Sequence, residues 1–420
     1  MERRDFLKLA AISGLSVAGP LRFLNMAHAS EADPYTGPLW VMVHASGGWD
    51  PTSLCDPKGR VNEEEEAPLN MFFKDEIGEI GQIRYAPVEG HQAFFEKYYS
   101  QLLIINGLDT STNGHDSGTR NVWSGSLREG HPSFAALVAG VYAPQKPMAF
   151  ISSGGYDYTA GLVAPTRVGD TNVLAELAFP NRIAADNEER LFHTESTVER
   201  IAQARAARFE RQQQKQRLPN LNHSMDMLHT ARVGGNELKQ LTDYLPPLDN
   251  SGNNLKRQAQ VAIAAYKAGI AISANLSIGG FDTHGNHDAT HFPRLQLLLE
   301  GVDFLMEEAA RQGVADQVVV MVSSDFGRTP GYNAGNGKDH WSITSAMLMG
   351  PGIVGNRVLG ITDDYHAPFY VDPNTFEPSE TGLRITPAHV HRALRSHAGI
   401  LDTELSQQFP LNVEDLPLFG

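Results

Sequence analysis

Cysteine is almost absent from this chain, and basic residues are scarce relative to acidic ones. Cys55 is the only cysteine among 420 residues. A single thiol cannot form an intramolecular disulfide, so the fold has to rest on its core and on any metal that it binds. The 34 Lys and Arg residues are outnumbered by 49 Asp and Glu residues, which gives a formal net charge of -15. This acidic balance argues against nucleic acid or an anionic membrane as a partner.

Long hydrophobic runs are also missing after the first thirty residues, so we expect no transmembrane segment in the mature chain. The N-terminus has the three parts of an export signal: the basic stretch Arg3–Lys8, the short apolar stretch Leu9–Ala18 and the small-residue pattern Ala27–Ala29. The adjacent arginines followed by Phe-Leu-Lys resemble a twin-arginine signal. We therefore expect residues 1–29 to be a signal peptide and the mature protein to be periplasmic or otherwise exported by that route.

Short apolar runs predict a series of buried strands at Leu39–His44, Gln101–Asn106, Pro147–Ile151, Ile270–Ile278, Gln317–Ser323 and Ser345–Met349. Continuous apolar runs of this length are typical of parallel strands that are buried on both faces. From Leu295 to Ala309 the apolar positions recur every three or four residues, which predicts a helix. The alternation of strands and helices predicts an α/β fold with a mostly parallel sheet flanked by helices.

The middle of the chain interrupts this alternation. Residues 184–217 are dominated by Glu, Arg, Gln and Ala and contain few large apolar side chains, which predicts a long exposed helix. We therefore expect residues of about 180–255 to form a helical insertion in one domain that spans residues 30–420. The exposed helix is also a candidate surface for assembly with other proteins.

Polar motifs follow the predicted strands where each strand ends, which is where an open α/β sheet binds its ligands. Asp282 and His284 follow one strand, and His287 and His291 lie within the next ten residues. Carboxylates and imidazoles together suit a divalent metal such as zinc or manganese, and we favour Asp282 and His284 as ligands. Asp50 follows the first strand as a further candidate ligand, although an aspartate here can equally cap a turn or helix.

Asp325 ends the strongest predicted strand, where a buried carboxylate needs a cation or hydrogen-bond donors. One interpretation is a structural ion pair with Arg328, three residues later. The other is that Asp325 binds the metal and Arg328 binds an anionic substrate, because guanidinium suits phosphate and sulfate geometry. His340 lies in a glycine-containing loop that can fold back over the site, either as a ligand or as a hydrogen-bonded loop histidine.

The nucleophile is the least specific prediction. Residues 110–115, Thr-Ser-Thr-Asn-Gly-His, follow the second predicted strand. A hydroxyl in this segment, with Ser111 as the candidate, can attack an ester if a metal lowers its pKa. On spacing alone, a Ser/Thr-rich turn is the stronger interpretation.

The order of these motifs resembles the alkaline phosphatase superfamily, and the segment Ser111–His115 resembles Ser-x-x-Gly-His of cofactor-independent phosphoglycerate mutases. More closely, the chain is similar to an exported bacterial family, domain of unknown function 1501 (DUF1501). The segments that carry this resemblance, besides the N-terminal signal, are Gly47–Asp50, Asp282–His284, Ser324–Thr329 and Asp339–Trp341. The resemblance implies an alkaline-phosphatase-like fold, metal ligands at strand ends and Ser111 as the nucleophile.

Two departures from the superfamily limit what the resemblance implies. Phe326 stands where its hydrolases have a histidine beside the strand-end aspartate, so one of the two usual metal sites loses a ligand. Four residues after Asp282 comes Asn286, and His287 follows it, so the spacing of the first Asp/His pair is unusual. The resemblance therefore implies one divalent metal, which is zinc, manganese or calcium, rather than two.

These expectations combine into one hypothesis and its alternatives. Asp282, His284 and His340 are expected to bind the metal, while Asp50 and Asp325 bind a second, weaker metal or orient the nucleophile. The expected activity is hydrolysis or transfer of a small anionic ester, a phosphate or a sulfate. The alternative is an extracytoplasmic binding or assembly protein that keeps the fold without catalysis.

Overall fold

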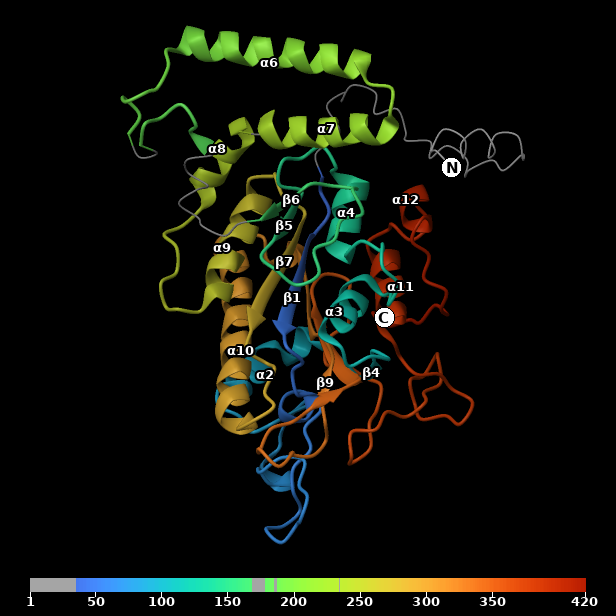
Figure 1. The fold of residues 1–420 in the computed structure, drawn as a ribbon. Coiled ribbons are helices and arrows are strands. Elements are labelled where there is room, and N and C mark those ends of the chain that lie inside the picture. The colour runs from blue at the N-terminus through green and yellow to red at the C-terminus, as the bar shows by residue number, and fades with distance from the viewer. Residues whose placement is uncertain (1–34, 168–177, 185–186, 234) are drawn as a thin grey trace, which may run out of the picture.

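An eight-stranded sheet forms the centre of the computed structural model, which describes residues 35–167, 178–184, 187–233 and 235–420. In spatial order its strands are β12 (Arg357–Leu359), β4 (Leu103–Asp109), β11 (Ile343–Met349), β8 (Val318–Ser324), β1 (Leu39–Ser46), β7 (Ser273–Gly279), β5 (Phe150–Ser152) and β6 (Pro165–Arg167) (Figure 1). β11 runs antiparallel to β4 and β8, and the other neighbouring strands pair in parallel. The predicted mostly parallel α/β sheet is therefore confirmed.

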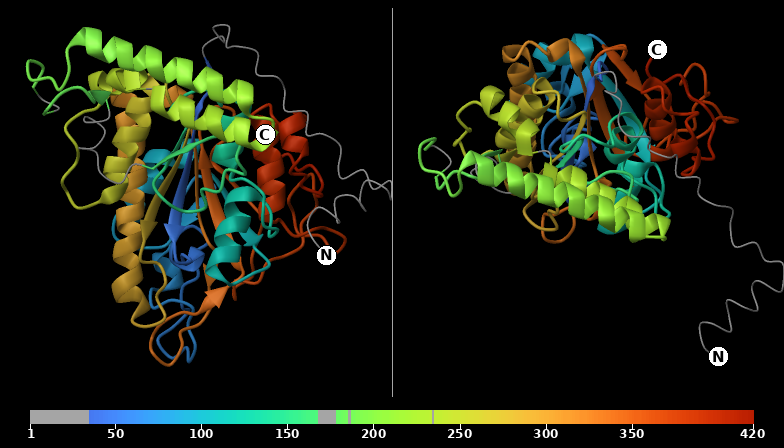
Figure 2. Two further views of the ribbon diagram at one scale, coloured as in Figure 1. Left: turned by 45° about the horizontal axis from the view of Figure 1, so that its top comes forward. Right: turned by 90° about the horizontal axis from the view of Figure 1, so that it is seen from above.

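Helices cover both faces of this sheet. One face carries α2 (His91–Tyr98), α9 (Asn254–Lys267) and α10 (His287–Arg311), and the other carries α3 (His115–Ser124), α4 (Phe134–Tyr142) and α11 (Pro387–His397) (Figure 2). The central strand β1 serves both faces, because successive side chains of a strand point in opposite directions. Val41 and Val43 join the first cluster of buried residues, and Trp40 and Met42 join the second.

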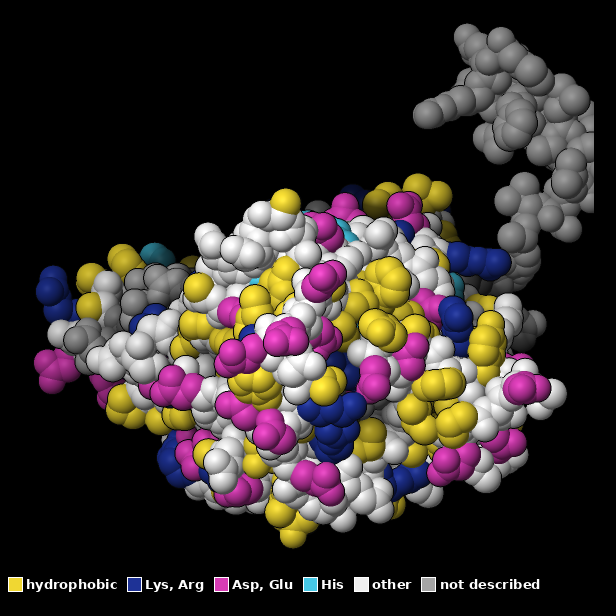
Figure 3. Space-filling view, turned by 90° about the horizontal axis from the view of Figure 1, so that it is seen from below, with side chains coloured by type: hydrophobic (Ala, Val, Ile, Leu, Met, Phe, Trp, Pro, Cys, Tyr) yellow, Lys and Arg dark blue, Asp and Glu magenta, His cyan; other side chains and the backbone are white. Residues whose placement is uncertain are grey.

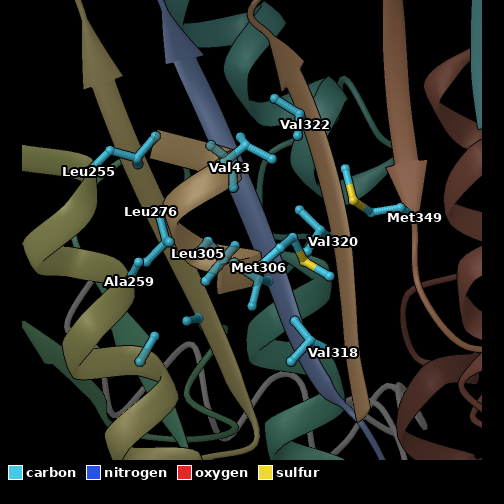
Figure 4. Packing of buried hydrophobic residues seen from close by; sticks show 14 of the residues in the cluster. Val43, Leu255, Ala259, Leu276, Leu305, Met306, Val318, Val320, Val322 and Met349 are labelled. Atoms are coloured by element: carbon cyan, nitrogen blue, oxygen red, sulfur yellow. The ribbon is translucent and has the colours of Figure 1, made fainter. Parts of the chain in front are cut away.

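The apolar strands form because their side chains fit between the sheet and the helices. Val43, Leu276 and Val320 come from three neighbouring strands and face Leu255 of α9 and Leu305 of α10 (Figure 4). Burying one such side chain stabilises the fold by about 1.5 to 3 kcal/mol. Packing on both faces therefore holds the central strands, and with them the polar residues that follow at their carboxyl ends.

The exposed helix predicted within residues 184–217 is present as α6 (Glu195–Lys215), and no residue of α6 is buried. α7 (Pro219–Val233) lies beside α6 across the end of the sheet opposite the carboxyl ends of the parallel strands, and α8 (Gly235–Tyr244) leads back to α9 (Figures 1 and 2). α9 contributes Leu255, Ile263 and other buried side chains to the core. The pair α6 and α7 therefore lies outside the core, whereas α9 is part of it.

Smaller elements connect these layers. β9 pairs with β10 in antiparallel fashion and sets His340 opposite Arg328, so the loop between them returns to the end of β8. The smaller elements are β2 (Gly78–Ile80), β3 (Ile83–Tyr85), β9 (Gly327–Arg328), β10 (His340–Trp341), α12 (Glu404–Gln407) and the 3-10 helices η1 (Pro51–Ser53), η2 (Lys74–Glu76), η3 (Tyr99–Gln101) and η4 (Ala315–Gln317).

The predicted export signal, residues 1–29, lies outside the described residues. Part of the predicted insertion, residues 185–186 and 234, lies outside them as well. Among the helices that are described, none has the length and apolar character needed to cross a membrane.

Candidate metal centre

Four side chains, three of them predicted as ligands, meet at the carboxyl ends of the strands. Asp282 Oδ1 lies 3.1 Å from His340 Nε2 and 3.0 Å from His284 Nε2, and these two nitrogens are 3.0 Å apart. His115 Nε2 approaches the other oxygen, Asp282 Oδ2, at 3.5 Å. The structure thus brings together the three residues that the sequence favoured as ligands and adds His115.

The elements that carry these residues explain why they meet. Asp282 and His284 follow β7, His340 opens β10, and His115 is the first residue of α3, which follows β4. The return loop before His340 packs directly on the backbone of His284. A Cβ on Gly337 would lie 2.0 Å from the His284 carbonyl, so only glycine permits this approach.

The outer nitrogen of each histidine ring, Nδ1, faces a hydrogen-bond acceptor. These acceptors are the Asp339 carboxylate for His284 (2.7 Å), the Asn113 carbonyl for His340 (2.8 Å) and the Asp325 carboxylate for His115 (2.7 Å). A carbonyl or ionised carboxylate has no proton to give, so each Nδ1 carries the hydrogen. In the neutral imidazoles every Nε2 then presents a lone pair, and all three lone pairs face the region around Asp282.

This arrangement fits a divalent metal. Lone pairs on neighbouring nitrogen and oxygen atoms repel one another unless a proton or a cation lies between them. Ligand atoms that share one ion at about 2.0 to 2.1 Å stand about 3 Å apart, as Asp282, His284 and His340 do. Mixed imidazole and carboxylate donors suit zinc and manganese, and an acceptor behind each metal-binding histidine is the usual supporting arrangement. Donor atoms of His115, Asp282 and His340 also lie within 4.8 Å of one another.

Arg328 fixes the carboxylate at the centre of this cluster. Its side chain is fully buried, and its Nη2 donates to Asp282 Oδ1 at 2.7 Å. Burial raises the pKa of Asp282, but the hydrogen bond from Arg328 and the contact with the His340 ring outweigh it and bring the pKa to about 2. Asp282 is therefore ionised at neutral pH. Nη2 also donates to the Gly47 carbonyl, Nε donates to the Gly48 carbonyl and Nη1 donates to the Lys338 carbonyl, so this guanidinium positions Asp282 and does not face an open pocket.

Asp325 supports His115 from behind. Its Oδ2 accepts from His115 and from the Gly47 amide at 3.2 Å, and its Oδ1 lies 2.9 Å from His44 Nε2. Trp123 Nε1 donates to His44 Nδ1 at 2.7 Å, so the neutral His44 ring carries its hydrogen on Nε2, toward Asp325. Burial raises the pKa of Asp325, but His44 and His115 outweigh it and lower the pKa. Asp325 reaches the cluster through His115.

Asp50 lies apart from the cluster in a fully buried position. Its carboxylate caps η1 by accepting from the Thr52 amide at 2.9 Å, and Lys338 Nζ lies 2.6 Å from it. Burial raises the pKa of Asp50, but Lys338 and His287 outweigh this and hold the pKa well below its usual range. The capping role that the sequence left open for Asp50 is therefore present, and its cation is a lysine.

His287 and His291 also face Asp50 and not the cluster. The Asp50 amide donates to His291 Nε2 at 2.9 Å, so the hydrogen of this ring is on Nδ1, 3.0 Å from Thr283 Oγ1. Thr283 in turn donates to His287 Nδ1 at 2.7 Å, and His287 Nε2 lies 3.2 Å from Asp50. Burial lowers the pKa of both histidines. These neutral rings attach the start of α10 to the loop after β1.

Ser111 occupies an exposed loop between β4 and α3 with a left-handed backbone, φ 55°. Its amide donates to Asp109 Oδ1 at 2.8 Å, which closes a turn at the end of β4. Within the described part of the chain its hydroxyl has no hydrogen-bond partner, whereas the hydroxyls of Thr110 and Thr112 are bonded. The same loop supplies the Asn113 carbonyl to His340, so it lies beside the cluster.

His115 is the ligand candidate that sequence reasoning missed. It lies inside residues 110–115, a segment whose pattern predicts Ser111 as the nucleophile and gives the His115 ring no role. The available signal was its position as the first residue after Gly114 at the start of a helix that follows a buried strand. Asp339, which orients His284, was likewise part of a recognised motif without a role.

An open pocket of about 500 Å³ adjoins the cluster on the α3 side. His115 belongs to both the cluster and the pocket wall, and Asp325, which supports His115, also lines the pocket. The remaining wall includes Ser46 at the end of β1, Arg120 of α3 and Tyr156 from the loop after β5. The site therefore combines a set of metal-ligand candidates with space for a small molecule beside them.

The fold and the site define an α/β protein with a candidate metal centre at the carboxyl ends of its parallel strands. More particularly, the chain belongs to the DUF1501 family, described as proteins of unknown function, whose pattern it matches over residues 39–377. No curated protein matches it.

Several solved structures are similar to this chain. A candidate sulfatase, yidJ from Bacteroides fragilis, is 12% identical with a TM-score of 0.43, over 93% of this chain and 78% of that protein. The lipoteichoic acid synthase LtaP from Listeria monocytogenes is 8% identical with a TM-score of 0.39. The match covers 90% of this chain and 76% of that protein. A variant of TAB5 alkaline phosphatase with bound magnesium is 11% identical with a TM-score of 0.34. The match covers 77% of this chain and 94% of that protein.

Proposed function

We propose that this chain binds one divalent metal through Asp282, His284, His340 and His115 and hydrolyses or transfers a phosphate or sulfate ester. The observation that carries the proposal is the set of histidine Nε2 atoms directed at one ionised carboxylate, each ring tied by its Nδ1 to an acceptor. When bound, a divalent metal supplies Lewis-acid stabilisation of negative charge and lowers the pKa of an attacking oxygen.

The residues around the cluster have separate roles in this proposal. Arg328 keeps Asp282 ionised and in place, and Asp339 and Asp325 keep the rings of His284 and His115 oriented. Ser111 is the proposed nucleophile, because it is exposed on the loop that contacts His340 and its hydroxyl has no hydrogen-bond partner among the described residues. Export of the protein is proposed from Arg3, Arg4 and the segment after them, and cell fractionation of the full-length chain tests it: a wholly cytoplasmic protein would sink this part.

Phe326 favours a second candidate function, metal-dependent binding without turnover. Its ring is buried, with its centroid 4.5 Å from that of His340 and 5.0 Å from that of His115. An apolar ring in this position offers no ligand to a second metal, so a two-metal clamp on attacking and leaving oxygens is not available there. A protein with a single metal can bind an anionic ester and release it unchanged.

Metal content is the first test. Elemental analysis of the purified wild-type protein is expected to find near-stoichiometric zinc or manganese, and the double variant Asp282→Ala, His284→Ala is expected to lose it because two of the ligands are gone. His193→Ala is the matched control, since His193 is exposed and outside the cluster. Metal-free wild type that is folded and stays empty after addition of zinc, manganese and calcium would contradict the proposal.

Turnover separates the two candidate functions. A panel of phosphate and sulfate esters is expected to show metal-dependent hydrolysis that His340→Ala abolishes and that Ser111→Ala lowers at least about a thousandfold. Full metal content with no turnover on a broad panel would favour the binding protein. Full activity in Ser111→Ala would remove Ser111 from the mechanism and leave water as the attacking group.

A further inference from the structure

A substrate with a phosphate or sulfate group needs a cationic partner besides the metal, and Arg328 is not free to provide it. Its guanidinium is fully buried and donates to one carboxylate and three backbone carbonyls. The face of the molecule at the strand ends is scattered with acidic side chains, and basic side chains form smaller groups among them (Figure 3). An anion that approaches this face therefore depends on a specific positive charge inside the site.

Arg120 has the placement that such a partner requires. Among the described residues that line the pocket beside the cluster, it is the one with a permanent positive charge. Its Nε donates to the Leu127 carbonyl at 3.0 Å, which fixes the guanidinium plane. The nearest carboxylate is that of Glu129, 3.9 Å from Nη1, and the Glu129 side chain is 90% exposed against 18% for Arg120.

The free edge of this guanidinium matches a tetrahedral anion. In the described part of the chain, Nη1 and Nη2 have no hydrogen-bond partner, since the Glu129 contact is longer than a hydrogen bond. Two parallel N–H groups of this kind bind phosphate or sulfate in a bidentate manner. Arg120 and His115 are five residues apart on α3, and both line the pocket. The pocket wall therefore contains both Arg120 and His115, which is a member of the cluster.

We propose that Arg120 binds the phosphate or sulfate group of the substrate in this pocket, with the pocket as the substrate site. This inference rests on the proposed metal-dependent function. Asp116 and Asp325 also line the pocket, so the wall without metal carries more negative than positive charge. Anion binding is accordingly expected to need both the metal and Arg120.

The test is calorimetric titration of the metal-loaded protein with inorganic phosphate and, separately, with sulfate. Arg120→Gln removes the charge while its amide can still donate to the Leu127 carbonyl, and it is expected to weaken anion binding at least about tenfold. Arg128→Gln removes the same charge from an exposed position on the neighbouring loop and is expected to leave the affinity unchanged. Glu129→Gln is expected to strengthen binding slightly, because the competing carboxylate is gone.

The outcomes separate this inference from the function on which it rests. Unchanged phosphate and sulfate affinity in Arg120→Gln, with full metal content, overturns the inference and leaves the metal centre standing. Wild type without metal overturns the proposed function and this inference with it. Equal weakening in Arg120→Gln and Arg128→Gln points to general surface charge and also overturns the inference.

A second measurement uses wild-type protein alone and does not depend on how a variant folds. Phenylglyoxal modifies accessible arginines, and peptide mass mapping reports each site. Phosphate is expected to protect Arg120 at least severalfold in the metal-loaded protein while Arg128 reacts as before. Modification of Arg120 at the same rate with and without phosphate would contradict the assignment.

Discussion

At the scale of single residues, two strand-end aspartates with similar sequence settings have different environments. Asp282 is partly exposed and surrounded by histidine nitrogens, whereas Asp50 is fully buried against Lys338. The difference comes from the residue that supplies the neighbouring charge. Lys338 balances the charge of Asp50, whereas Arg328 and, in the proposed function, a metal balance the charge of Asp282.

Removal of the Asp50 charge is expected to lower the free energy of unfolding and to leave the metal content unchanged. In Asp50→Asn the buried Lys338 ammonium loses its counter-ion, and breaking a buried pair in this way costs about 3 to 5 kcal/mol of unfolding free energy. Urea unfolding measures the loss, and elemental analysis of the folded fraction is expected to find the wild-type metal content. Asp75→Asn, at an exposed carboxylate, is the control and should leave the urea midpoint unchanged. Metal loss at unchanged stability would make Asp50 a ligand.

Asp282, His284 and His340 were predictable as ligand candidates, because imidazole and carboxylate groups at the ends of buried strands are typical of metal sites. The role of His115 was not predictable, because it depends on the direction in which the first turn of α3 leaves the sheet. The burial of Arg328 was not predictable either, because its carbonyl partners Gly47 and Gly48 belong to a turn that is distant in sequence. Residue type and position in the chain indicate chemistry, but the partners of each side chain come from the packing of separate loops.

At the scale of elements, α3 packs directly against the end of β8, and both carry residues of the candidate site. Gly118 of α3 lies against the Asp325 backbone, and a Cβ there would be 2.4 Å from the Asp325 carbonyl oxygen and 3.0 Å from the Phe326 ring. The same helix carries His115, and the same turn carries the Asp325 carboxylate that orients it. A shift of α3 therefore changes the distance between His115 and Asp282.

Gly118→Ala tests this contact. An alanine in a helix normally stabilises it by up to about 1 kcal/mol over glycine. Here the added methyl group has to displace backbone, so the variant is expected to lose about 1 to 3 kcal/mol of unfolding free energy and to bind metal more weakly. Metal titration and thermal unfolding measure both effects. Gly279→Ala is the control at the same sheet edge, because a Cβ there meets no atom within 4 Å. A stabilised Gly118→Ala with unchanged metal affinity would contradict the argument.

The elements themselves were predictable to different degrees. Long apolar strands such as β1 and β8 follow from burial on both faces and appear where the sequence predicts them. The edge strands β6 and β12 were not predicted, because each has three residues and includes polar side chains. β9 and β10 have two residues each, too few for any periodic pattern, yet their pairing brings His340 to the site.

At the scale of the whole molecule, stability depends on both helical layers, and each contains a buried histidine away from the site. His91 of α2 donates from Nδ1 toward the Ala86 carbonyl, and His391 of α11 donates from Nε2 toward the Val122 carbonyl. The second nitrogen of each ring is buried without a partner among the described residues. Burial lowers the pKa of His91 to about 4 and that of His391 to about 4.

Lowering the pH is therefore expected to reduce the free energy of unfolding at pH values above those at which the carboxylates become protonated. In the unfolded chain a histidine has a pKa of 6.5 and binds a proton as the pH falls through that value. In the folded state His91 and His391 stay neutral until the pH falls to about 4. Between those values the unfolded chain binds more protons, so the free energy of unfolding falls as pH falls, by up to about 3 kcal/mol for each histidine. The stability that the two neutral histidines contribute is fully present above pH 6.5 and is lost at about pH 4.

Urea unfolding at a series of pH values, with metal removed by chelator from every sample, measures this slope. The double variant His91→Gln, His391→Gln keeps a donor at each position but cannot titrate, so its stability is expected to fall less steeply between pH 6.5 and pH 4.5. The remaining slope comes from other buried histidines with a lowered pKa, such as His287 and His291. His193→Gln, at an exposed histidine, should keep the wild-type slope. If the double variant shows the same acid slope as wild type, the loss of stability arises elsewhere, and the buried histidines of the two layers do not set the acid limit of the fold.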